Sequence, residues 1–179
     1  MTKKISSFLA RRQPETPCLV LDLDIVAQNY AKLRQAMPDA RIYYAMKANP
    51  APEILTLLAG LGASFDAASI NEIDLVLAAG AGPERISFGN TIKKQADIAA
   101  AYARGVRLYA FDSWAELEKI AAAAPGSRVF CRITTSGEGA EWPLSRKFGC
   151  DPATAAELLR LAVELELEPY GLSFHVGSQ

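Results

Sequence analysis

Apolar runs and helical segments alternate along most of the chain. Six short runs rich in β-branched and aromatic residues predict β-strands, and the first five begin about every 20 residues. Alanine- and leucine-rich segments with helical spacing separate the runs, and most of these segments end at glycine. The predicted strands lie at 41–47, 63–68, 85–89, 107–111, 128–134 and 169–179, and the predicted helices at 48–62, 69–80, 90–105, 112–126 and 152–167.

The character of the apolar runs predicts the fold class. Strands that are apolar on both faces are typical of parallel sheets covered by helices, and units of this length suit right-handed β-α-β crossovers. The class is therefore α/β, and the evenness of the units favours a (β/α)8 TIM-type barrel over an open, doubly wound sheet. Because a complete barrel usually needs roughly 200 to 250 residues and this chain has 179, we expect a partial barrel with six of the eight strands.

Three regions are expected along the chain. Residues 1–15 predict a lightly packed N-terminal arm, because their apolar residues are few. Residues 16–40 predict a strand, within the apolar run 18–26, and then a helix that leads into the barrel. Residues 41–179 predict the barrel itself, in which the chain makes a longer detour between the fifth strand and the last helix.

Helix start signals precede three of the predicted helices. Asn49 stands where a side chain can cap the first one. Ser69 and Glu72 have the spacing of a capping box, in which the two side chains bond to each other's backbone amides. Ser113 and Glu116 repeat this spacing and are expected to do the same.

Composition and charge exclude several classes of protein. A chain with 50% hydrophobic and 22% charged residues is typical of a globular domain. Nineteen basic and twenty acidic residues leave a net charge of −1, so no nucleic-acid or membrane-surface partner is expected. No stretch approaches the roughly 20 apolar residues of a membrane span. The three cysteines lack the pairing of a zinc site, so no metal is expected, and their number favours the cytoplasm.

Polar residues close the six apolar runs. In a parallel α/β fold, chemistry gathers at the carboxyl ends of the strands. The chain offers there an amine, two carboxylates, an amide, a guanidinium and its only histidine. In order of sequence these candidates are Lys47, Asp66, Asn90, Asp112, Arg132 and His175.

Lys47 and Asp66 close neighbouring strands. A lysine that ends a buried strand loses hydration of its ammonium form, which lowers its pKa and frees the amine to form a Schiff base with a carbonyl. The alternative is a lysine that reaches out to solvent. Asp66 is expected to lie close enough to pair with Lys47, or else to cap the next helix, although Ser69 is better placed for that. The capping spacing of Glu72 explains it and is compatible with a role in the site.

Arg132 and His175 close the fifth and sixth strands. Alternation along its strand would bury Arg132, which then needs a carboxylate or a ligand as partner. A lone histidine is more often a core residue with satisfied hydrogen bonds. Here, however, Gly177 allows close backbone approach and Ser178 offers a hydroxyl donor, a combination that suits a planar phosphorylated ligand.

Four motifs in a fixed order carry a family resemblance. YYAMKANP, FDAASINEI, CRI with the later LSRKFG, and SFHVGSQ resemble the fold-type III pyridoxal-phosphate-dependent decarboxylases of basic amino acids, whose barrel is alanine-racemase-like. This group includes ornithine, lysine, arginine and diaminopimelate decarboxylases. The resemblance extends from Thr16 to Gln179, and FDAASINEI and LSRKFG resemble the ornithine decarboxylase branch most.

The resemblance implies a set of residues around pyridoxal 5'-phosphate. Lys47 matches the lysine that holds the cofactor aldehyde, and Asp66 and Glu72 match acidic residues that surround the cofactor. Arg132 matches an arginine beside the cofactor ring, and His175 matches the imidazole that stacks on the ring. The resemblance therefore implies that Lys47, Asp66 and His175 take part in catalysis.

The resemblance also implies that part of the family's active site lies outside this sequence. Ser178 matches a hydroxyl that binds the cofactor phosphate. The acid facing the pyridine nitrogen, the glycine-rich phosphate loop and the cysteine that protonates the substrate have no match here, nor does the family's C-terminal β-domain. The 179 residues are therefore expected to be an N-terminal portion that is inactive by itself.

The activity implied is decarboxylation of a basic amino acid. The first expectation is L-ornithine to putrescine, a step of polyamine biosynthesis, and lysine or diaminopimelate is the alternative substrate. A non-catalytic pyridoxal-phosphate carrier or regulator is an alternative from another class. By analogy with the family, the full-length protein is expected to be a cytoplasmic homodimer that acts on a small-molecule amino acid.

Overall fold

Six parallel strands form one sheet and pair in the order of the sequence. The computed structural model describes residues 1–136, 138–139, 141 and 147–177. The strands are β1 (Tyr43–Ala45), β2 (Ser64–Ala67), β3 (Ile86–Phe88), β4 (Leu108–Phe111), β5 (Arg128–Arg132) and β6 (Glu168–Ser173). The predicted α/β class and partial barrel are confirmed.

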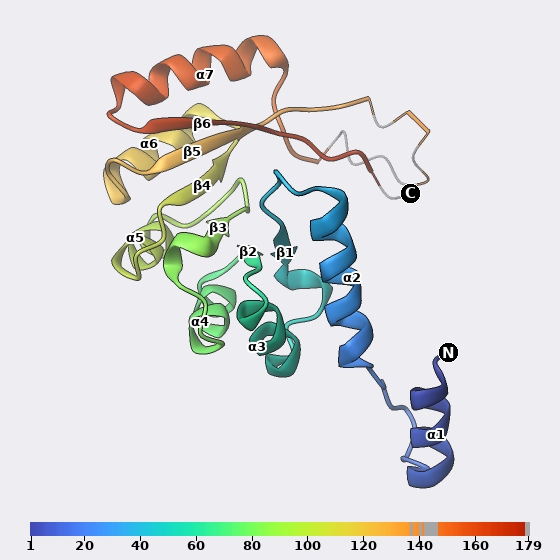
Figure 1. Ribbon diagram of the computed structural model, residues 1–179. Coiled ribbons are helices and arrows are strands. Elements are labelled where there is room, and N and C mark those ends of the chain that lie inside the picture. Colours follow the sequence, from blue (N-terminus) through green and yellow to red (C-terminus); the bar gives the residue numbers. More distant parts are fainter. Residues whose placement is uncertain (137, 140, 142–146, 178–179) are drawn as a thin grey trace.

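Five helices connect the strands in turn and lie on the outer side of the curved sheet (Figure 1). Two further helices precede β1, and single 3-10 turns lie at Met46–Ala48 and Pro83–Arg85. The helices are α1 (Lys3–Arg12), α2 (Leu23–Ala36), α3 (Pro52–Gly60), α4 (Ile70–Ala78), α5 (Gln95–Ala103), α6 (Trp114–Ala123) and α7 (Pro152–Glu164).

The register of the strands aligns their carboxyl ends. Ala45 of β1 lies opposite Asp66 of β2, and Asp66 lies opposite Ser87 of β3. At the other end of the sheet, Arg132 lies opposite Ser173 of β6. Residues that follow different strands are therefore brought to one rim, although they are far apart in the sequence.

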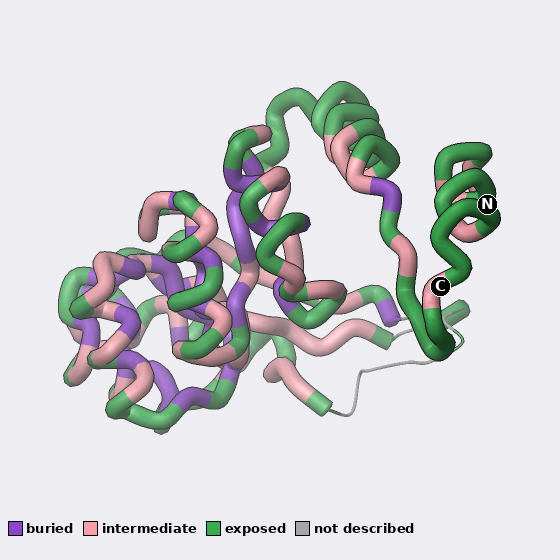
Figure 2. Tube along the Cα trace, turned by 90° about the horizontal axis from the view of Figure 1, so that it is seen from below, coloured by how far each residue is buried: buried purple, intermediate pink, exposed green. Residues whose placement is uncertain are grey.

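The core lies between the sheet and its covering helices. The burial colours in Figure 2 follow this arrangement, with most buried segments on the strands and on the inward sides of the helices. Large side chains of the strands and of α3, α4, α6 and α7 are fully buried there and fill the space between the layers. Among them are Leu55, Phe65, Ile73, Phe88, Tyr109, Phe111, Leu117 and Leu158.

The region before β1 differs from its prediction. Residues 16–22 form no strand, and the run 18–26 instead leads into α2, which Asp22 caps by accepting a hydrogen bond from the amide of Asp24. A strand needs a neighbour for its backbone groups, and the described residues supply none there. Leu19 and Leu21 stay exposed as a result. The arm at 1–15 is also more regular than predicted, because it contains α1, which buries no residue.

Two of the three expected helix caps differ in detail or fail. Ser69 caps α4 as predicted. Asn49 accepts from the amide of Ala51, but α3 begins only at Pro52, so Asn49 lies two residues too early to be its cap. Ser113 precedes α6 without a side-chain cap, so the expected bond is absent. No helix of the described residues has both the length and the apolarity needed to cross a membrane.

Core packing of α7 gives a test of the fold. Leu158 is fully buried, whereas Val163 on the same helix is 62% exposed. Leu158→Ala is expected to lower the free energy of unfolding by about 2–5 kcal/mol, because it leaves a cavity. The control Val163→Ala is expected to change it by at most about 0.5 kcal/mol. Urea unfolding followed by circular dichroism measures both, and equal losses would contradict the packing described.

Candidate functional site

A cavity of about 240 Å³ lies at the carboxyl-end rim of the strands. Six of the predicted site residues line it together, although they come from five different strand ends and one helix. The lining residues are Ala45, Lys47, Asp66, Ala68, Glu72, Gly89, Asn90, Thr91, Arg132, Phe148 and His175. A second hollow, along the inner face of the sheet, shares Asp66, Gly89, Arg132 and His175 with it.

Lys47 lies in the 3-10 turn that follows β1. Its neighbour Met46 is fully buried and anchors this turn, while the Lys47 side chain is exposed. The expectation that burial would desolvate its amine is therefore wrong for this structure. The expected ion pair with Asp66 is not formed either, since no nitrogen–oxygen distance between the two is within 4.0 Å. Both residues line the same cavity nonetheless.

Asp66 is held at the end of β2 by Ser87 of β3 and by Gly89, which directly follows β3. The Ser87 hydroxyl donates to Asp66 Oδ1 at 2.5 Å. A Cβ on Gly89 would lie only 2.0 Å from the same oxygen, so any larger residue there would displace the carboxylate. Burial raises the pKa of Asp66 above its ordinary value, and the hydrogen bond from Ser87 opposes that shift.

Glu72 has the backbone role that its spacing predicts, with a small difference. The Glu72 amide donates to Ser69 Oγ at 3.3 Å. In return, Glu72 Oε2 accepts from the amide of Ala68 at 2.6 Å, one residue before the position expected in a capping box. Its carboxylate lines the cavity at the same time. The cap and a role in the site are therefore compatible.

Arg132 ends β5 and is partly buried. Within the described part of the chain its guanidinium makes no ion pair, so the expected structural carboxylate partner is not observed. It lies instead over the ring of Phe148, 5.2 Å from the ring centroid. Phe148 belongs to the segment that leads back to the sheet before α7. This segment is held in place because the amide of Gly149 donates to Asp112 Oδ2 at 2.9 Å. Asp112 thus holds this return segment and does not line the cavity.

His175 follows β6 and is oriented by its own backbone. The amide of Gly177 donates to His175 Nδ1 at 2.8 Å, so Nδ1 is an acceptor and a neutral ring carries its proton on Nε2. The carbonyl of His175 accepts from the Thr135 hydroxyl at 2.7 Å. Ser178, which is predicted to bind the cofactor phosphate, lies outside the described residues.

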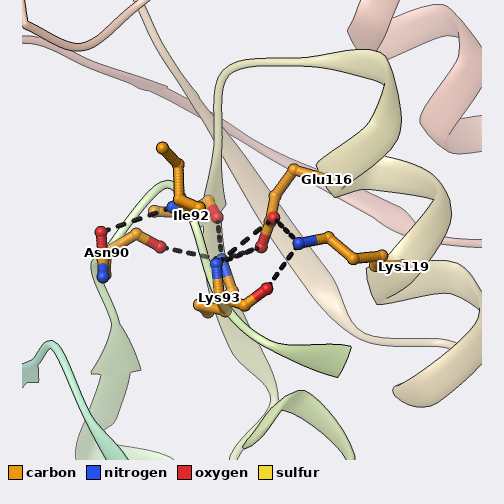
Figure 3. A network of polar contacts seen from close by, with 6 residues as sticks. Asn90, Ile92, Lys93, Glu116 and Lys119 are labelled. Carbon is orange, nitrogen blue, oxygen red and sulfur yellow. Dashed lines mark hydrogen bonds and ion pairs between the residues drawn. The ribbon is translucent and has the colours of Figure 1, made fainter. Parts of the chain in front are cut away.

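A buried ionic cluster that the sequence pattern does not predict lies beside the site. Glu116 was expected to complete a capping box with Ser113, and this expectation is wrong. Its carboxylate instead pairs with Lys93 and Lys119 at 2.8 and 2.5 Å (Figure 3). Lys93 lies only three residues after Asn90, which lines the cavity. The sequence offers little to predict this cluster, because the spacing of Lys93 along the chain does not identify Glu116 as its partner.

A family model matches residues 23–179, and its description is pyridoxal-dependent decarboxylase, pyridoxal binding domain. The chain belongs to this family. A curated relative, the lysine/ornithine decarboxylase of Selenomonas ruminantium, is 41% identical over 100% of the chain and 45% of its own length. The chain thus spans about half the length of this relative.

Solved structures of the family have the same fold. A variant of lysine decarboxylase from Selenomonas ruminantium, crystallised with pyridoxal phosphate, superposes with a TM-score of 0.91 at 41% identity, over 100% of this chain and 46% of its own. The arginine decarboxylase of Paramecium bursaria Chlorella virus has the same TM-score at 31% identity, over 99% of this chain and 48% of its own.

Pyridoxal 5'-phosphate is the cofactor of the pyridoxal-dependent decarboxylases, and the donor set of the cavity fits it. An amine on Lys47 suits the cofactor aldehyde, and an aromatic imidazole on His175 suits the ring. Arg132 supplies a cation for an anionic ligand. Asp66 and Glu72 supply the acidic groups that a cationic pyridinium favours. The residues present therefore fit the group chemically.

The environment of Asp66 gives a prediction on stability. Because its folded-state pKa is raised, Asp66 contributes most to stability below the ordinary carboxyl value of 3.8 and loses this contribution as the pH rises through the folded-state pKa. Asp66→Asn keeps the acceptor for Ser87 and removes the buried charge. Its midpoint of thermal unfolding at pH 7 is expected to equal or exceed that of the wild type, and the difference is expected to shrink in acid.

Differential scanning calorimetry of the cofactor-free chain at several pH values measures this difference. Asp39→Asn, at an exposed position, serves as the control and is expected to show no such trend. A midpoint for Asp66→Asn clearly below the wild type at pH 7 would contradict the assignment.

Proposed function

We propose that the rim cavity binds pyridoxal phosphate and that the protein containing this chain decarboxylates a basic amino acid, with L-ornithine as substrate and putrescine as product. The convergence of Lys47, Asp66, Glu72, Arg132 and His175 in one cavity supports the proposal most directly. The chain covers about half of its relatives, so the activity of the whole protein is part of the proposal.

Lys47 and His175 have the central roles in this proposal. Lys47 binds the cofactor aldehyde through its amine, and its position at the cavity wall leaves the amine accessible. His175 lies against the ring, with its orientation set by the Gly177 amide. When bound, the cofactor supplies an electron sink for the pair released as the substrate carboxylate leaves as carbon dioxide.

The remaining residues orient and neutralise the bound groups. Arg132 offers its guanidinium to the cofactor, with one face covered by Phe148. Asp66 and Glu72 surround the cofactor with acceptors and negative charge, and the raised pKa of Asp66 falls when a cation comes close. Ser178 donates to the cofactor phosphate; this assignment rests on the SFHVGSQ motif alone.

Removal of the Lys47 amine tests cofactor binding. A longer protein that contains this sequence is expected to gain an absorption band on titration with pyridoxal phosphate. Borohydride is expected to trap a covalent adduct on Lys47, located by mass spectrometry of the digest. Lys47→Ala is expected to abolish both signals, because no other described lysine lines the cavity. Lys32→Ala, at an exposed position of α2, serves as the control outside the cavity. A trapped adduct that persists in Lys47→Ala would contradict the assignment.

Substrate preference is tested on a longer protein that contains this sequence. Release of carbon dioxide is measured with L-ornithine, L-lysine, L-arginine and diaminopimelate at equal concentrations. The value of kcat/KM is expected to be highest for L-ornithine, with L-lysine second. The 179 residues alone are expected to produce no diamine. A higher value for another substrate would replace ornithine, and no release with any of them would favour the carrier or regulator.

The assembly and compartment complete the proposal. We infer a homodimer for the longer protein, by analogy with the family, and sedimentation of a monomer at micromolar concentration would contradict it. We also propose a cytoplasmic location. The thiols of Cys18, Cys131 and Cys150 are all free, which is typical of a reducing compartment. Imaging of the tagged protein in its host tests the location.

A further inference from the structure

A lysine and a glutamate with almost no exposure lie directly behind the cavity wall. The Lys93 side chain is 0% exposed and the Glu116 side chain is 2% exposed, and Lys93 Nζ lies 2.8 Å from Glu116 Oε1. Lys119 reaches the same carboxylate at Oε2. Figure 3 shows the three side chains converging between the turn after β3 and the first turn of α6.

The ammonium group of Lys93 uses all of its donors. Besides Glu116, it donates to the carbonyl of Asn90 at 2.8 Å and to the carbonyl of Ala110 at 2.6 Å. An ammonium has three hydrogens, and these three acceptors account for them. Burial lowers the pKa of Lys93 to about 8, and the charge of Glu116 opposes the shift. The ammonium therefore remains the main form at neutral pH.

These bonds join the ends of two neighbouring strands. Asn90 follows β3, and Ala110 lies in β4, so one side chain ties both to the same point. Glu116 also accepts from the backbone amide of Lys93, at 3.2 and 3.3 Å. The carbonyl of Lys93 accepts from Lys119. The turn at 89–93 is thus held by both its backbone and its side chain.

The same turn forms a wall of the cavity and touches Asp66. Gly89, Asn90 and Thr91 line the cavity. The amide of Gly89 donates to the carbonyl of Ala67 at 2.9 Å, and the Asp66 carboxylate fills the space that a Cβ of Gly89 would need. A shift of the turn would therefore move the Asp66 carboxylate, because no gap separates them.

We propose that Lys93 and Glu116 are positioning residues that set the turn at 89–91 against Asp66 and thereby determine how tightly the cavity binds pyridoxal phosphate. This inference rests on the proposed binding of pyridoxal phosphate at the cavity. Stability alone gives a weak reason for such a pair, since a buried ion pair is often no more stabilising than apolar residues of similar volume. The two hydrogen bonds from Lys93 to the carbonyls of Asn90 and Ala110 instead fix the position of the turn relative to β4.

A double variant separates positioning from stability. Lys93→Met alone leaves Glu116 with less compensation and is expected to lower the midpoint of thermal unfolding. Lys93→Met with Glu116→Leu removes both charges and is expected to recover most of that midpoint. Without the Lys93 ammonium, nothing joins the carbonyls of Asn90 and Ala110, and the turn can shift. The Kd of the double variant for pyridoxal phosphate is therefore expected to rise about tenfold or more, because small displacements of site residues commonly have effects of this size.

The exposed pair of Arg104 and Asp74, 2.6 Å apart between α4 and α5, supplies the matched control. Arg104→Met with Asp74→Asn is expected to leave the Kd unchanged. The variants are made in the longer protein. Absorbance titration with pyridoxal phosphate measures the Kd of each variant, and calorimetry measures the unfolding midpoint of the same samples. If the Lys93/Glu116 double variant does not fold, Glu116→Gln, which keeps the side-chain volume, carries the test.

The outcomes distinguish this inference from the proposed function. A wild-type Kd in the folded double variant, or in Glu116→Gln where that variant is used, would overturn the positioning role. An equal rise in Kd for the Arg104/Asp74 control would also overturn it, because the effect would then be general destabilisation. If the longer protein with the wild-type sequence fails to bind pyridoxal phosphate, the proposed function fails and takes this inference with it.

Discussion

The common direction of the six strands is the constraint on which the site depends. In a parallel sheet with sequential order, every strand delivers the residues that follow it to the same rim. Residues from four strand ends line one cavity, although the first and the last are 128 positions apart in the sequence. They are Lys47, Asp66, Arg132 and His175. No local motif could bring them together. The helices between the strands make this possible, because each one returns the chain to the end of the sheet at which the next strand begins.

The rim is crowded where β2 and β3 end, and this crowding determines its electrostatics. Asp66 is partly buried against Gly89 and accepts from Ser87, so its charge is disfavoured in the folded protein. A bound cation would relieve that cost. A positive charge placed beside Asp66 would therefore oppose the effect of burial and favour the ionised carboxylate.

Much of this arrangement could be predicted from the sequence, because parallel strands covered by helices have a distinctive apolar pattern. The six strands and the residues that close them follow from that pattern. The strand expected within 18–26 does not, since an apolar run acquires strand pairing only where a neighbour is available. Likewise, the spacing of Ser69 and Glu72 produces a cap, while the same spacing at Ser113 and Glu116 does not. Lys93, far away in sequence, competes for the second carboxylate.

Two lysines at neighbouring parts of the rim show why burial alone does not identify a reactive amine. Lys93 is the buried one, yet three acceptors occupy its donors and a carboxylate faces its charge. It cannot approach a ligand without breaking all of these bonds. Lys47 is exposed, and no hydrogen bond or ion pair to another described residue holds its amine, although it faces the cavity. Access and unused bonding capacity, rather than desolvation, therefore single out Lys47.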